Sequence, residues 1–202
     1  MGRKAYNEGM NDSHLKILAS PEWAAQLETD LLPWIEAAGD LGDDVLEIGP
    51  GPGLTTDLLR ARVTRLTALE VDEALAVPLR ARLTGTNVDV ICADATRAGL
   101  DPERFSGATC FSMLHHMPTP ADQDRLFAEV GRVLRPGGVF VGQDSLDLDF
   151  IRAGHEDDTF VPVDPDGFPK RLSAVGLEDT HIEANDFHFL FLSRKPLPAT
   201  RG

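Results

Sequence analysis

The sequence predicts an α/β fold in which a doubly wound, mostly parallel, seven-stranded sheet ends in an antiparallel hairpin. Three observations predict it. From residue 44 onward, short apolar runs alternate with helical patterns, which is typical of a parallel sheet with helices on both faces. The last two apolar runs are separated by Ala184-Asn185-Asp186, and this is favourable chemistry for a hairpin turn. The chain has 202 residues, enough for one sizeable core but too few for two domains of ordinary size.

The first predicted helix begins near Ser20, a candidate N-cap, and Pro21, which suits the first helical position. An apolar stripe at helical spacing follows, at Leu27, Leu31, Leu32 and Ile35. Pro33 should kink or split this helix, because it lacks the N–H group and its ring clashes with the preceding turn. We therefore expect residues 1–38 to form a helical flap of the same domain, and residues 39–202 to form its main part.

The remaining elements follow in order along the chain. We expect strands at Val45–Ile48, Arg65–Val71, Val88–Cys92, Ala108–Met113, Val139–Gly142, Glu178–Glu183 and Phe187–Ser193. We expect helices at Leu54–Arg62, Glu73–Leu83, Ala121–Leu134 and Phe168–Val175. The run Arg135-Pro136-Gly137-Gly138 indicates a stop and a turn, and the acidic residues 147–166 indicate a loop.

Charge and composition exclude several classes of function. The formal net charge is −14 and the sequence pI is about 4.7, so a general nucleic-acid binder is disfavoured. Cys92 and Cys110 are the two cysteines; they cannot form a disulfide framework and fit a reducing cytosol. Because the sequence has no apolar leader and no run of about 18 apolar residues, we expect a cytoplasmic protein without membrane insertion. A homodimer stays open.

The most informative stretch is the loop Glu47-Ile48-Gly49-Pro50-Gly51-Pro52-Gly53, which joins the first predicted strand to the helix after it. Glycine at every second position allows tight turning and a close approach of a ligand to the backbone, and the helix N-terminus offers free N–H groups. In a doubly wound fold this is where the ligand crevice lies. A dinucleotide fingerprint would need its third glycine at position 54, which is Leu54, so the spacing disfavours a nicotinamide oxidoreductase.

Carboxylates also end the next two strands. Glu70 closes the second strand, about twenty residues after the first loop glycine, where a carboxylate can accept from both hydroxyls of a ribose. Asp94 follows the third strand, where it can accept from an exocyclic amine. Together with the loop and Arg135-Pro136-Gly137-Gly138, these residues resemble the ordered motifs of the class I S-adenosylmethionine (SAM)-dependent methyltransferases. The resemblance covers residues 40–195 and implies a Rossmann-like fold, methyltransferase activity and SAM as the cofactor.

The resemblance also implies a role for each motif residue. Glu47 would accept from the ammonium of SAM, directly or through water, Glu70 from the ribose diol and Asp94 from the adenine amine. Val71 would pack on the adenine face, and the Ala95 N–H would donate to the ring. The implied cofactor-binding set is Glu47, Gly49, Gly51, Gly53, Glu70, Val71, Asp94, Ala95 and Ser112. SAM has a cationic end and no pyrophosphate, so these carboxylates favour SAM over NAD.

The fourth predicted strand runs into Ser112-Met113-Leu114-His115-His116, where this family brings the methyl acceptor to the cofactor. The histidine pair resembles the type 11 branch, which acts on small molecules, so we expect a small-molecule acceptor with O- or C-methylation favoured. Histidine titrates near neutrality and can accept a hydroxyl proton. His115, His116 and His155 are therefore the candidate catalytic residues, with His14 as a further candidate in the flap. A structural histidine bonded to backbone is the alternative for each.

Alternatives to this function stay open. Residues 45–95 are also similar to the ribosomal-RNA adenine dimethylases, but Ser112-Met113-Leu114-His115 is not their Asn-x-Pro-Tyr motif, and the charge of −14 opposes RNA. A non-catalytic SAM-binding protein is the second alternative.

Neither a metal site nor a further substrate contact is expected from the remaining residues. No metal is expected, because the fourth strand does not end in carboxylates. Asp144, Asp147, Asp149 and His155 could hold a cation, but a solvated acidic loop is favoured. Trp23, Trp34, His181 and His188 are expected to pack rather than to contact substrate.

Overall fold

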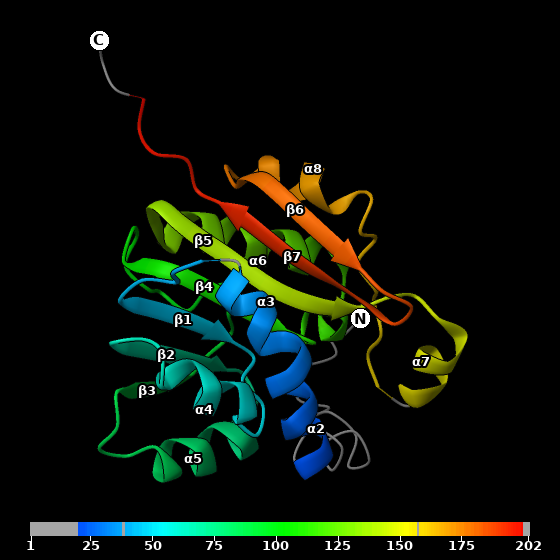
Figure 1. The fold of residues 1–202 in the computed structure, drawn as a ribbon, viewed down its shortest axis with the longest axis horizontal. Helices are drawn as coiled ribbons and strands as arrows, with labels where there is room; N and C mark the ends of the chain where they lie inside the picture. Colours follow the sequence, from blue (N-terminus) through cyan, green and yellow to red (C-terminus); the bar gives the residue numbers. More distant parts are fainter. Residues whose placement is uncertain (1–19, 38, 157, 200–202) are drawn as a thin grey trace, which may run out of the picture.

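The computed structural model describes residues 20–37, 39–156 and 158–199, and His14 lies outside these residues. Seven strands form one sheet in the order β3-β2-β1-β4-β5-β7-β6 (Figure 1). Neighbouring strands are parallel from β3 to β5, whereas β7 is antiparallel to both β5 and β6. The predicted fold class, a doubly wound and mostly parallel sheet closed by an antiparallel hairpin, is confirmed.

The described elements follow the predicted order closely. The strands are β1 (Asp44–Ile48), β2 (Arg65–Glu70), β3 (Val88–Cys92), β4 (Phe105–Phe111), β5 (Leu134–Ser145), β6 (Glu178–Ala184) and β7 (His188–Arg194). The helical segments are α2 (Pro21–Gln26), η1 (Leu27–Leu31), α3 (Leu32–Ala37), α4 (Leu54–Arg60), α5 (Glu73–Arg82), η2 (Leu114–His116), α6 (Pro120–Val133), α7 (Asp149–Gly154) and α8 (Phe168–Ser173).

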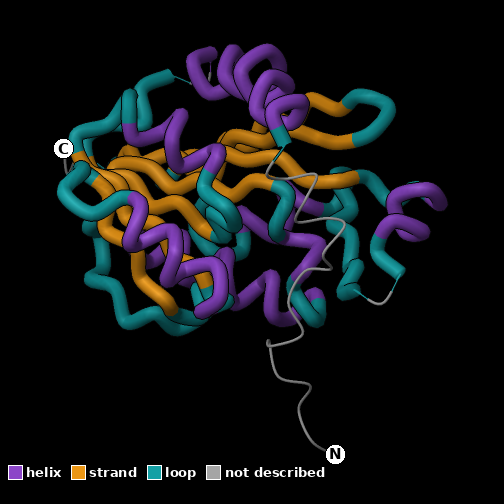
Figure 2. Tube along the Cα trace, turned by 90° about the horizontal axis from the view of Figure 1, so that it is seen from below, coloured by secondary structure: helices purple, strands orange, loops and turns teal. Residues whose placement is uncertain are grey.

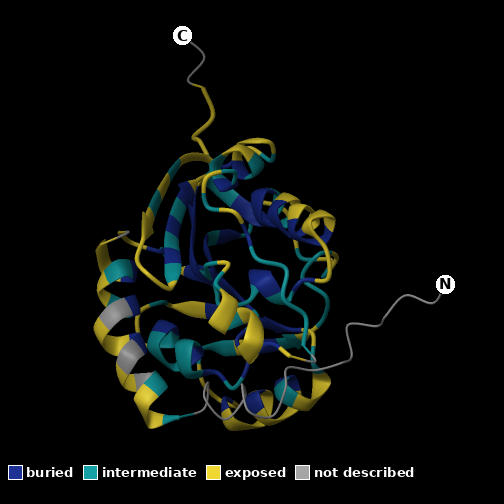
Figure 3. Cartoon of the chain, turned by 90° about the vertical axis from the view of Figure 1, so that its right-hand side faces the viewer, coloured by how far each residue is buried: buried dark blue, intermediate teal, exposed yellow. Residues whose placement is uncertain are grey.

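Helices cover both faces of the sheet (Figure 2). Val45 of β1 packs with the segments α2 to α4 on one face, and its neighbour Leu46 packs with α6 and α8 on the other. Because successive side chains of a strand point to opposite faces, every residue of β1 is buried. Figure 3 shows the buried residues in the sheet and on the inner faces of the helices. No helix among the described residues is long and apolar enough to cross a membrane.

The N-terminal helix is continuous but irregular. The backbone N–H of Trp23 donates to Ser20 Oγ at 3.1 Å, which confirms the N-cap. The segment η1 is a π-helical turn that ends two residues before Pro33. A proline cannot donate to the carbonyl four residues earlier and its ring would meet that carbonyl, so the wider turn accommodates Pro33. Leu27, Leu31 and Ile35 are buried against the sheet.

Three local expectations need correction. Residues 147–166 are not all loop, because Asp149–Gly154 form α7. Arg152 ties this helix to the chain before it, because its guanidinium donates to both carboxylate oxygens of Asp147 at 2.6 and 2.7 Å. The run 135–138 belongs to β5 as an irregularity opposite Phe105–Gly107, because its backbone bonds with Lys195 beyond β7.

The fourth strand begins and ends earlier than predicted, since it stops at Phe111. The next residue, Ser112, has φ of 51°, a left-handed conformation that a strand cannot continue through. This turn directs the chain into η2 and places the residues after it at the carboxyl edge of the sheet.

Candidate active site

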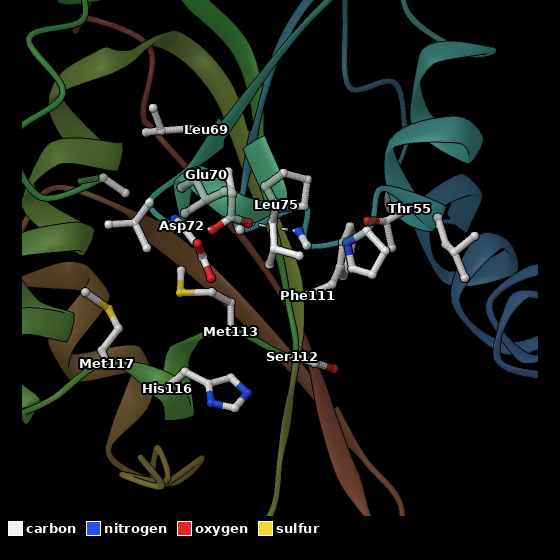
Figure 4. A pocket seen from close by; sticks show the side chains of 18 of the residues that line it. Thr55, Leu69, Glu70, Asp72, Leu75, Phe111, Ser112, Met113, His116 and Met117 are labelled. Atoms are coloured by element: carbon white, nitrogen blue, oxygen red, sulfur yellow. Dashed lines mark hydrogen bonds between the residues drawn. The ribbon is translucent and has the colours of Figure 1, made fainter. Parts of the chain in front are cut away.

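A pocket of about 740 Å³ lies at the carboxyl edge of the sheet. Strand order reverses between β1 and β4, and the carboxyl ends of strands at such a point form a natural crevice. The glycine loop after β1, the ends of β2 and β3, the turn after β4 and the segment α2–η1 all contribute lining residues. Figure 4 shows Glu70 and Asp72 in one part of the pocket and His116 in another, with Met113 between them in this view.

Two of the three loop glycines line the pocket. Gly51 has φ of 55°, and a Cβ built there meets no heavy atom within 4 Å, so its backbone faces open space. Gly49 has φ of 69°, and a Cβ there would lie 2.5 Å from Met113 Cγ. Gly53 does not line the pocket; a Cβ there would lie 2.4 Å from Leu79 Cδ1. A side chain at Gly53 would therefore clash with α5 and would not enter the pocket.

Glu70 fastens the glycine loop to the start of α5. Its carboxylate accepts from the backbone N–H of Gly51 and from that of Asp72, both at 3.0 Å. Burial raises the pKa of Glu70, and these backbone hydrogen bonds oppose that rise. Glu70 lines the pocket, so this side chain both shapes the loop and faces the ligand space.

Glu47 lies behind the pocket wall and does not line it. Its two oxygens accept from the hydroxyls of Thr55 and Thr56, at 2.5 and 2.6 Å, and its exposure is 1%. Burial raises the pKa of this carboxyl to about 7, although both hydroxyl bonds lower it. The structure therefore places Glu47 where it holds the first turn of α4 and not where it can touch a ligand directly.

The remaining predicted cofactor residues line the pocket. Val71, Asp94, Ala95 and Ser112 all belong to its wall. Asp94 accepts from the backbone N–H and the hydroxyl of Thr96 at 2.9 and 2.8 Å, so its carboxylate is oriented by the turn that follows β3.

The described part of the pocket wall is acidic. Four carboxylates line it, and no lysine or arginine of the described residues does. The four are Glu70, Asp72, Asp94 and Asp158. Because like charges repel in a partly buried site, this wall disfavours a phosphate-bearing ligand and favours a ligand with a positive charge.

The structure brings the three candidate histidines together but places them differently. His116 lines the pocket, whereas His115 does not: the 3₁₀ turn of η2 directs the His115 ring inward, where its Nδ1 bonds the carboxylate of Asp144. Asp144 is fully buried, which overturns its expected place in a solvated acidic loop. His155 follows α7, and its ring centroid lies 5.0 Å from that of His115 and 5.3 Å from that of His116.

Several pocket residues were missed by reasoning from the sequence. Trp23, Leu27 and Leu31 form part of the wall. Trp23 was expected only to pack, and it does pack against the core as well. Because Trp23 is far from the glycine loop along the chain, no sequence pattern connects the two. Trp34 stacks on His181, with ring centroids 5.9 Å apart, as expected for a packing residue.

Comparison with known proteins gives a family match. A family model described as a methyltransferase domain, of type 11, matches residues 46–142. These residues are therefore similar to the SAM-dependent methyltransferases, in agreement with the resemblance found in the sequence. The match spans β1 to the middle of β5, and so contains the glycine loop, Glu70, Asp94 and the histidine pair.

The curated relatives of this chain differ in the substrates that their names give. The chain is 36% identical over 110 residues to a ubiquinone biosynthesis O-methyltransferase of Pseudomonas fluorescens, covering 52% of this chain and 46% of the relative. It is 48% identical over 62 residues to a ribosomal RNA small subunit methyltransferase A of Koribacter versatilis, covering 30% and 22%. The match thus spans less than half the length of these curated relatives.

A solved structure shares its fold with nearly the whole chain. A crystal structure of a Pyrococcus horikoshii protein superposes with a TM-score of 0.78 at 17% identity, covering 93% of this chain and 100% of that one. At this identity the likeness establishes the fold, including the terminal hairpin, and nothing about the acceptor.

Proposed function

We propose that this chain transfers a methyl group from SAM to a small-molecule acceptor, at an oxygen or a carbon atom. One observation carries the proposal. A single pocket joins the glycine loop and the strand-end carboxylates to an apolar wall made by α2–η1 and the turn after β4. A nucleotide-like cofactor and a second, less polar molecule can therefore lie side by side in one cavity.

The cofactor half of the pocket suits SAM. Glu70 accepts from the ribose hydroxyls, Asp94 from the adenine amine, and Val71 covers the ring. Gly51 leaves room for the methionine part, because no protein atom lies within 4 Å of where a Cβ would stand. The acidic wall supports the choice of SAM, since bound SAM supplies a sulfonium that makes its methyl group reactive.

The acceptor half is lined by Trp23, Leu27, Leu31, Phe111 and Met117. These side chains suit a largely apolar molecule, and Gln143 and His116 add polar groups that can orient it. Among the described residues, 20–37 and those between 145 and 170 are the segments that would cover the acceptor. The acceptor nucleophile forms a bond to the methyl carbon as the methyl–sulfur bond breaks, the neutral thioether of demethylated SAM leaves, and the acceptor's proton passes to His116 or to water. Catalysis therefore rests mainly on holding the two molecules in line.

A second candidate is methylation of ribosomal RNA, which the local match to the RNA methyltransferase favours. The net charge of −14 and the acidic pocket wall oppose it, because an RNA substrate brings phosphates to the site.

Calorimetry and a transfer assay test the proposal together. Wild-type protein should bind SAM and its demethylated product but not NAD. The Gly51→Val variant should bind neither SAM nor the demethylated product. With methyl-labelled SAM, label should enter a small-molecule fraction of a cell extract and not purified small-subunit ribosomal RNA. Binding of NAD without SAM would refute the cofactor assignment, and label confined to RNA would refute the acceptor class.

A further inference from the structure

The three candidate histidines form a buried cluster beside the pocket. His115 and His116 come from η2, and His155 comes from the end of α7. One ring nitrogen from each lies within 4.8 Å of the other two. The rings are packed against Phe160, whose centroid lies 5.4 Å from that of His115 and 4.6 Å from that of His155.

The Nδ1 atom of each ring already faces an acceptor. His115 Nδ1 bonds the Asp144 carboxylate. His155 Nδ1 donates to the backbone carbonyl of Ile151 at 2.7 Å, and His116 Nδ1 lies 3.7 Å from Asp158 Oδ1. The outward nitrogen of each ring is therefore Nε2, and all three Nε2 atoms are buried. For His115, that atom has no hydrogen-bond partner among the described residues.

This pattern is the one that metal-binding histidines show. A ligating histidine usually donates its second ring N–H to a carboxylate or a backbone carbonyl, which fixes the tautomer and presents the other nitrogen. Here Nδ1 of His115 bonds a carboxylate and Nδ1 of His155 bonds a backbone carbonyl, while the Asp158 carboxylate lies 3.7 Å from Nδ1 of His116. The buried His115 Nε2 has no partner among the described residues, whereas most buried polar atoms in proteins have one.

We propose that His115, His116 and His155 bind a divalent transition-metal ion of the zinc class through their Nε2 atoms. Three nitrogen ligands at about 2.0–2.1 Å from a tetrahedral zinc ion are about 3.3 Å apart. One ring nitrogen of each histidine lies within 4.8 Å of the other two, so metal binding requires the ligating nitrogens to move closer together. Imidazole nitrogen suits zinc, whereas magnesium and calcium take oxygen ligands. The carboxylates of Asp144 and Asp158 offset the charge of the ion.

The site would keep one coordination position open toward the pocket. His116 and Asp158 line the pocket, and three histidines with a fourth open position are the arrangement of catalytic zinc sites. This step rests on the proposed function: the open position would receive an oxygen of the acceptor, which selects an acceptor with a hydroxyl group. The proposed site would replace the expectation, drawn from the sequence, that the protein binds no metal.

Metal binding is measured first, without SAM. Tag-free protein is stripped with a chelator and titrated with Co²⁺, whose visible absorption distinguishes four-coordinate from octahedral sites, and with Zn²⁺ in competition. We expect one ion per chain with a four-coordinate spectrum. His155→Ala should weaken binding by more than about 100-fold, and Asp158→Asn by about 10- to 100-fold. His181→Ala is the matched control, because His181 is exposed, and it should bind as wild type.

Two variants test the metal site independently of each other. Circular dichroism establishes whether His155→Ala folds, and Asp158→Asn decides the matter if it does not. Absence of stoichiometric Co²⁺ and Zn²⁺ binding, an octahedral spectrum, or unchanged affinity in the folded variant would overturn the site. Calorimetry with SAM on the metal-free protein separates the two proposals: SAM binding without metal binding refutes only this inference, and metal binding without SAM binding refutes only the proposed function.

Discussion

The buried carboxyl of Glu47 should make the stability of the protein depend on pH, and Glu47→Gln should remove that dependence. Burial raises the pKa of Glu47 to about 7 from an ordinary 4.5. Between these values the folded state holds a proton that the unfolded state has released. The free energy of unfolding therefore falls as pH rises. The stabilising contribution is fully present below about pH 4.5 and is lost as pH rises through about 7.

The size of the effect follows from the two pKa values. The gap between about 7 and 4.5, at about 1.36 kcal/mol for each pH unit, sets an upper limit of about 3.4 kcal/mol. Over a workable range, from about pH 5 to about pH 8, linkage gives a loss of about 2.5 kcal/mol. A glutamine keeps the shape and an oxygen that can accept from Thr55 or Thr56, but it does not titrate.

Urea unfolding of wild type and Glu47→Gln at several pH values measures this contribution. Titration of other groups cancels in the difference between the two proteins. The free energy of unfolding of wild type, relative to the variant, should fall by about 2.5 kcal/mol from about pH 5 to about pH 8. A difference that stays constant within experimental error, or that rises with pH, would refute the burial argument.

Three further substitutions test the pocket and the core. Gly51→Val should abolish SAM binding in calorimetry while the far-ultraviolet circular dichroism stays near wild type, and normal affinity would place the ligand elsewhere. Glu70→Ala removes a charged acceptor worth about 1.5–3 kcal/mol, so SAM affinity should fall about 10- to 100-fold; a change below twofold would show that Glu70 does not hold the ribose. Gly142→Ala should lower the melting temperature markedly, because its Cβ would stand 2.2 Å from the Cys110 carbonyl oxygen and 2.3 Å from Phe191 Cζ, and unchanged thermal unfolding would mean that β5 relaxes without cost.

Local patterns in the sequence were sufficient for the fold and for the strand-end residues Glu70 and Asp94 that line the pocket. Apolar runs alternating with helical stripes predict a parallel sheet, and the glycine loop, Glu70 and Asp94 mark the ends of its first three strands. These ends must meet, because parallel strands present their carboxyl ends at one edge. Element boundaries were less certain: φ of 51° at Ser112 ends β4, and no residue type predicts that conformation there.

The tertiary structure decided which way each side chain points and which distant segments meet. Glu47 and Glu70 each lie at or near the end of a strand in the sequence, but their side chains lie in different places. The hydroxyls of Thr55 and Thr56 bind Glu47 outside the pocket lining, whereas the backbone N–H of Gly51 binds Glu70 in the pocket wall. His115 and His116 are neighbours, but one 3₁₀ turn sends them in different directions. His155 joins them from 39 or 40 positions further along the chain. The sequence by itself determined the strands and their functional ends, because these depend on local periodicity; the histidine cluster and the apolar wall depend on packing between remote segments, which local periodicity does not encode.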